Sequence, residues 1–69
     1  MEYSNSRVRE IIAEYIHDEK HRRIMERRLV DNVTIERLAE EFEISVSQTK
    51  RIIWKNSEIV YRHLEKDRK

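Results

Sequence analysis

The chain has 69 residues, which suffice for one small domain, and it contains no cysteine, glycine or proline. The lack of cysteine excludes disulfide-stabilised secreted scaffolds and cysteine zinc sites. The lack of glycine and proline disfavours an all-β fold, whose tight turns call for these residues or asparagine. No apolar run is long enough for a signal peptide or a membrane span. We therefore expect a cytoplasmic, all-α domain of four helices over residues 1–69.

A pair of helices is predicted within residues 6–31. The first covers about residues 6–17 and begins at an N-cap among Ser4, Asn5 and Ser6. Its apolar stripe has helical spacing and consists of Val8, Ile11, Ile12, Tyr15 and Ile16. The second helix begins after the N-cap Asp18 and ends at Asp31-Asn32, because asparagine tolerates the left-handed conformation that closes a helix.

A helix-turn-helix is predicted over residues 34–54. Thr34 caps its first helix, and Ser45 caps the second through a Ser-x-x-Gln capping box that ends at Gln48. The buried face of the first helix consists of Ile35, Leu38, Ala39 and Phe42. The small residue Ala39 lies where the second helix crosses the first. The second helix is extended over residues 55–66, with either a break or a bend at Asn56-Ser57. The alternative is an ordinary helical hairpin with a capped second helix.

Two residues depart from the usual helix-turn-helix pattern. Glu43 occupies the turn position where glycine is common, and a positive φ there costs a non-glycine residue about 1 kcal/mol. Thr49 stands at an inward position where valine or isoleucine is usual, so its hydroxyl needs a partner within the helix.

The second helix of this motif carries residues whose chemistry suits DNA. If Thr49 and Ile52 face the core, the positions that face solvent are Val46, Ser47, Gln48, Lys50 and Arg51. Arginine or lysine can donate to guanine, glutamine can pair with adenine, and valine can contact a thymine methyl. Residues that either contact phosphates or form a solvated face are Arg22, Arg23, Arg27, Arg28, Thr34 and Lys55.

The charge distribution agrees with this interpretation. Residues 1–44 hold 8 Lys/Arg and 11 Asp/Glu, whereas residues 45–69 hold 7 and 3, so the basic excess lies on and after the second motif helix. Phosphate attraction needs positive charge at this place. The alternative is a solvated basic tail.

Other residues leave alternatives open. Trp54 and Tyr61 lie seven apart on the last helix and form either core packing or the seam of a homodimer. His17 and His21 have the spacing of half a zinc site, but a helix start at Asp18 breaks the geometry. With no glycine-rich phosphate loop and only scattered carboxylates, we expect neither an enzyme nor a metal or cofactor site.

The pattern T-x-E-x-L-A-E-E-F-x-I-S-V-S-x-x-K-R-I-I from Thr34 onward resembles region 4 of the sigma-seventy class of bacterial sigma factors. It also resembles small phage and mobile-element regulators built on that domain. The segments over residues 15–17 and 22–31 resemble the preceding helical pair. The resemblance implies promoter reading by Val46, Ser47, Lys50 and Arg51, with Gln48 beside them, and RNA polymerase as a partner. If these 69 residues are the whole protein, we expect a regulator that shares this module, or a piece that works with a partner, and not a complete sigma factor.

These observations predict sequence-specific binding of double-stranded DNA by a small bacterial or phage transcription regulator. One alternative is a protein-interaction module, whose acidic face of Glu36, Glu40 and Glu41 docks on a basic surface such as one on RNA polymerase. Another is a DNA-binding subunit of a phage packaging or recombination complex.

Overall fold

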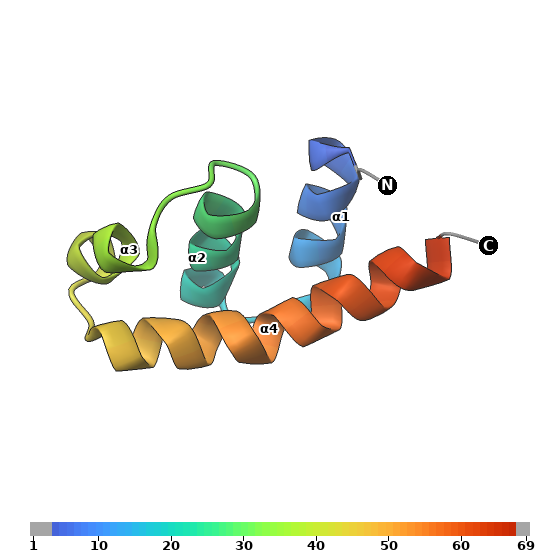
Figure 1. Ribbon diagram of the computed structural model, residues 1–69. Helices are drawn as coiled ribbons and strands as arrows, with labels where there is room; N and C mark the ends of the chain where they lie inside the picture. Colours follow the sequence, from blue (N-terminus) through green and yellow to red (C-terminus); the bar gives the residue numbers. More distant parts are fainter. Residues whose placement is uncertain (1–3, 68–69) are drawn as a thin grey trace.

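A computed structural model describes residues 4–67, which form four helices and no strand. They are α1 (Asn5–Tyr15), α2 (Glu19–Leu29), α3 (Ile35–Phe42) and α4 (Val46–Asp67). In Figure 1, α1 and α2 stand side by side on α4, and α3 lies near the start of α4. Within the described range α4 contacts each of the other helices, whereas α1 and α3 do not meet. The prediction of an all-α, four-helix fold is confirmed.

Side-chain caps fix where the first three helices begin. The Ser4 hydroxyl accepts a hydrogen bond from the backbone N–H of Arg7 at 3.2 Å, and the Asp18 carboxylate accepts from that of His21 at 3.1 Å. The Thr34 hydroxyl accepts a hydrogen bond from the backbone N–H of Arg37 at 3.3 Å. Each cap satisfies a donor that has no partner within its own helix. The predicted caps Asp18 and Thr34 are confirmed, and Ser4 is the cap among the three candidates.

The first helix is shorter than the predicted range of residues 6–17. It ends at Tyr15 because Ile16 has an extended backbone, with φ −106° and ψ 112°. The extended Asp18 that follows must leave the helix in order to cap α2. His17 and His21 therefore do not share one continuous helix, and the described residues contain no group of three side chains that could hold a metal ion.

One hydrophobic core is shared by all four helices. Its fully buried members include Ile11 and Ile12 from α1, Ile24 and Met25 from α2, Leu38 from α3 and Val60 from α4. Tyr15, predicted for the same stripe, is instead 36% exposed and stacks on His63 of α4, with ring centroids 3.6 Å apart. No helix within the described range has both the length and the apolar character needed to cross a membrane.

The turn between α3 and α4 has the predicted left-handed residue. Glu43 has φ 56° and ψ 45°, and its N–H donates to the carbonyl of Glu40 at 3.3 Å. The N–H of Ile44 donates to the carbonyl of Ala39 at 3.0 Å, which completes a Schellman arrangement. Ile44 also packs against the core. The turn is thus closed by two backbone hydrogen bonds and an apolar contact, without glycine.

α4 runs without a break through Asn56 and Ser57, so of the two alternatives, a break or a bend, the break is wrong. Asn56 is only 5% exposed, and its side-chain amide donates to the carbonyl of Ile52 at 2.8 Å. The same amide nitrogen lies 3.4 Å from Nδ1 of His21 on α2. Because the asparagine amide has polar partners inside the protein, it does not interrupt the helix.

Candidate nucleic-acid interface

The start of α4 is held against α3 by two small or polar residues. Ala39 is 7% exposed, and Thr49 is fully buried. The Thr49 hydroxyl donates to the carbonyl of Ser45 at 2.9 Å, so the predicted need for a partner within the helix is met. With Thr49 and Ile53 turned inward, the opposite face of α4 is left to solvent.

All five residues predicted to read bases are exposed. Ser47, Lys50 and Arg51 line one shallow hollow on α4, together with Trp54, Lys55 and Glu58. Val46 and Gln48 do not line it. The structure therefore gathers three of the five predicted residues on one surface, and two neighbours, Trp54 and Lys55, join them there.

Gln48 has a structural role that competes with base reading. Its side-chain oxygen accepts from the N–H of Ser45 at 3.2 Å, and its own N–H donates to the Ser45 hydroxyl at 3.0 Å. This is the predicted capping box. A bidentate contact with adenine needs both the oxygen and the nitrogen of the amide. Gln48 can make that contact only by leaving the cap.

The cations in this hollow are Lys50, Arg51 and Lys55. No carboxylate among the described residues forms an ion pair with any of them. Glu58, the acidic residue of the hollow, is paired instead with Arg62 at 3.8 Å. The outer face of α4 therefore presents three charges that are free to meet an anionic partner.

Two of the arginines predicted to contact phosphate are used inside the fold. Arg22 donates to the carbonyl of Ile16 at 3.1 Å, at the end of α1. Arg28 donates to the carbonyl of Val33 at 3.0 Å, in the loop that leads to α3. Both contacts are partly buried, and each satisfies a carbonyl outside the helix ladders. These side chains hold the connections between helices.

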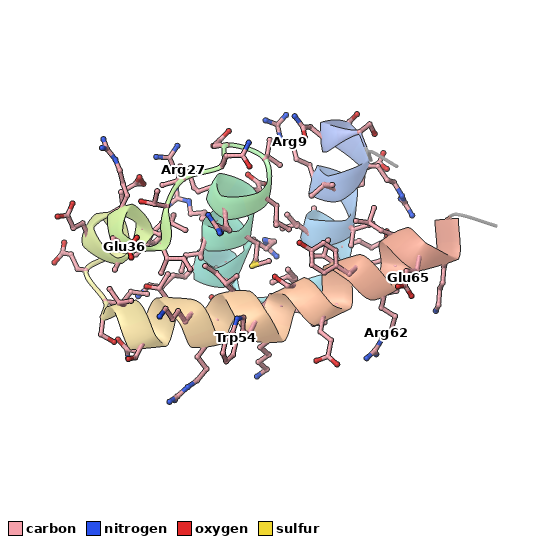
Figure 2. All side chains as sticks on the ribbon, in the orientation of Figure 1. Arg9, Arg27, Glu36, Trp54, Arg62 and Glu65 are labelled. Atoms are coloured by element: carbon pink, nitrogen blue, oxygen red, sulfur yellow. The ribbon has the colours of Figure 1, made fainter. Side chains whose placement is uncertain are left out.

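Arg27 links α2 to α3. Its guanidinium donates to both carboxylate oxygens of Glu41, at 3.2 and 2.5 Å, and to Asp31 at 3.3 Å. Hydrogen bonds from Arg27 lower the pKa of the Glu41 carboxyl. Figure 2 shows Arg27 near the end of α2 that is remote from Trp54 and α4. Arg27 is thus paired and lies away from the hollow on α4.

Arg23 is the remaining arginine of the predicted phosphate set on α2. It is exposed and has no hydrogen-bond or ion-pair partner among the described residues. It shares a hollow between α2 and α3 with Lys20, Phe42 and three glutamates, Glu19, Glu41 and Glu43. The sequence prediction omitted Lys20, although the spacing of three residues places it beside Arg23 on a helix. Thr34 is exposed and accepts a hydrogen bond as an N-cap, which leaves its hydroxyl hydrogen free to donate.

The core alternative for the two aromatic residues of α4 is wrong. Trp54 is 76% exposed and Tyr61 is 52% exposed. The buried apolar positions of this part of α4 are Ile53, Val60 and Leu64, as expected. Trp54 and Tyr61 are therefore surface residues that the fold of the monomer does not require.

Comparison with known proteins places the whole arrangement in a family. The family model of the Mga helix-turn-helix domain matches residues 4–65. This match covers all of α1, α2 and α3 and most of α4. No curated protein and no solved structure matches the chain. The helix-turn-helix prediction is confirmed, whereas the resemblance to sigma region 4 finds no support in the family match. The chain belongs to the Mga helix-turn-helix domain family and is a helix-turn-helix DNA-binding domain.

Proposed function

We propose that this domain binds double-stranded DNA sequence-specifically, as part of a small bacterial or phage transcription regulator, with the start of α4 in the major groove. The observation that carries the proposal is the unpaired cationic face of Lys50, Arg51 and Lys55 on the second helix of the motif. A helix-turn-helix presents this helix to base edges, and free cations attract the phosphates.

The dimensions suit this mode of binding. An α-helix with its side chains is about 10–12 Å across, and the major groove is about 12 Å wide. Ser47, Lys50 and Arg51 fall in the first two turns and would face the base edges. Lys55 comes a turn later and would meet the backbone. Because three free cations approach phosphates or bases, binding should weaken steeply as salt rises.

The first prediction concerns Lys50 and Arg51. After selection of the best-bound duplex from a random pool, Arg51→Ala or Lys50→Ala should weaken specific binding by about 1–3 kcal/mol, because each side chain donates to a base edge. Electrophoretic mobility shift at fixed salt measures the dissociation constants. The dependence of affinity on salt, measured for each variant with a non-specific duplex, shows whether the replaced side chain contacts a base or a phosphate.

Lys66→Ala is the matched control. Lys66 lies on the same helix and is also exposed, but it follows Arg51 by fifteen residues, about 22 Å along the axis. This variant should bind with the affinity of the original chain. Unchanged affinity for both Lys50→Ala and Arg51→Ala would contradict the assignment of α4 as the reading helix.

Docking on a protein such as RNA polymerase is the second candidate, and it rests on the acidic residues of α3. Glu36 and Glu40 are exposed and form no ion pair with a described residue, and Figure 2 shows Glu36 on α3. The predicted third member, Glu41, is bound to Arg27, so this acidic face is smaller than expected. A module that only docks on proteins would retain no duplex DNA in a mobility shift at low salt.

A further inference from the structure

Trp54 is exposed on the face of α4 that carries the free cations. It follows Lys50 by four residues and Arg51 by three, so the three side chains are neighbours on one side of the helix. All three line the same hollow with Lys55. At 76% exposed, Trp54 is the most exposed large apolar side chain among the described residues. Packing of the monomer does not account for a tryptophan at this position.

Its distance along the helix places Trp54 at the rim of the groove. Trp54 lies eight residues after Val46, about 12 Å along the axis, which exceeds the depth of the major groove, about 8.5 Å. A helix that enters the groove by its first turns would therefore bring Trp54 to the sugar-phosphate backbone. The indole offers one N–H donor and a flat apolar ring. Donors that contact phosphate position the protein without reading sequence.

We infer that Trp54 binds the DNA backbone at the edge of the major groove, with its ring against a deoxyribose and its Nε1–H donated to a phosphate oxygen. This inference rests on the proposed function, since it assumes that the start of α4 enters the groove. Lys55, the next residue, supplies a charged contact at the same edge. Trp54 and Lys55 together clamp the helix while Lys50 and Arg51 face the bases.

The charges favour DNA over a second copy of this chain as the occupant. The hollow holds three cations against the single carboxylate of Glu58, which is paired with Arg62. A two-fold interface over Trp54 would bring two such cationic faces together, and like charges across an interface oppose association. A homodimer seam at Trp54 would also cover Lys50 and Arg51. The same surface cannot read DNA and close a dimer at once.

The chain contains one tryptophan, so its fluorescence reports on Trp54 alone. The experiment titrates the full chain with the best selected duplex and follows tryptophan emission, while anisotropy of the labelled duplex follows binding. We expect emission to change in step with anisotropy. Trp54→Ala should weaken binding about tenfold, because a hydrogen bond to a charged group is lost. Trp54→Phe keeps an aromatic ring but has no N–H donor, so its affinity for the duplex should lie between that of the original chain and that of Trp54→Ala.

Two controls test this contact: the dependence of binding on salt, and a variant at another position on α4. Trp54→Ala should leave the slope of log affinity against log salt unchanged because the indole is neutral, whereas Lys55→Ala should reduce it by about one. Tyr61→Ala, on the same face about 10 Å further along α4, should bind as the original chain does. Because Trp54 is so exposed, its variants should retain the circular dichroism of the folded domain.

The outcomes separate this inference from the proposed function. If the duplex binds but tryptophan emission is constant and Trp54→Ala binds with full affinity, the contact is absent while the proposed function stands. If no duplex binds at any salt, both fail. Emission that shifts with protein concentration in the absence of DNA would assign Trp54 to a second copy and would overturn the inference.

Discussion

At the scale of single residues, Glu43 and Thr49 show how this domain keeps helix-turn-helix geometry with unusual side chains. Thr49 stands at a position where an apolar residue is usual, yet its buried hydroxyl is not left unpaired, because it donates a hydrogen bond to the Ser45 carbonyl. Glu43 keeps a positive φ that disfavours a residue with a Cβ, and the backbone hydrogen bonds of the turn hold it there. Asn32 also has a positive φ, but asparagine tolerates that conformation better. Glu43 is therefore a site of backbone strain within the motif.

Replacement of Glu43 by glycine should stabilise the domain. Glu43→Gly removes the Cβ that disfavours the left-handed conformation, and the free energy of unfolding should rise by about 1 kcal/mol. Urea denaturation followed by circular dichroism measures the change. Glu43→Ala is the control, because it removes the charge but keeps the Cβ. An equal gain for both variants would show that charge, and not the backbone, limits stability here.

At the scale of elements, the ends of the helices are set by local side-chain caps. The capping box of Ser45 and Gln48 fixes the first turn of α4, the helix that we propose reads DNA. The two residues satisfy each other's backbone donors, so the start of α4 does not depend on distant contacts. The residue at which α4 begins thus helps to set which of its side chains face solvent.

Loss of the cap should destabilise the start of α4. Ser45→Ala leaves the N–H of Gln48 without its acceptor and should lower the free energy of unfolding by about 1 kcal/mol. Ser47→Ala is the control, since the Ser47 side chain is exposed and bonds to no described residue. Thermal denaturation distinguishes the two variants. Equal stability of Ser45→Ala and the original chain would mean that tertiary packing alone holds this turn.

At the scale of the whole molecule, α4 forms the base on which the other three helices pack (Figure 1). The domain measures 38 × 20 × 16 Å, which reflects the length of α4. The contact between Arg27 and Glu41 joins α2 to α3 and thereby supports the first helix of the motif from outside the core. Its contribution depends on the charge of Glu41.

This contact predicts a stability difference that depends on pH. The pKa of Glu41 is lowered in the folded state by its hydrogen bonds from Arg27. The stabilisation is therefore complete above the ordinary pKa of a glutamate and is lost as the pH falls through the lowered folded value. Glu41→Gln should be less stable than the original chain at neutral pH, and the difference should vanish in acid. Denaturation of both chains across pH checks this, and a difference independent of pH would contradict it.

The local features of the fold were predictable because they depend on residues close together in the sequence. The caps Asp18 and Thr34, the left-handed Glu43 and the inward Thr49 all followed from spacing and residue type. The end of α1 was misplaced by two residues, since the extended cap of α2 limits it. The continuity of α4 was left open because it depends on Asn56, whose surroundings come from another helix.

Periodicity and capping act within a few residues, so the amino-acid pattern alone predicts that this protein is helical, where its helices begin and which face of α4 is exposed. Which cations are free depends instead on how the helices pack. Arg22, Arg27 and Arg28 are held by groups from neighbouring elements, as in the pair of Arg27 and Glu41, fourteen residues apart. Arginine reaches such partners through a long side chain, and only the packing of helices brings them within hydrogen-bond distance.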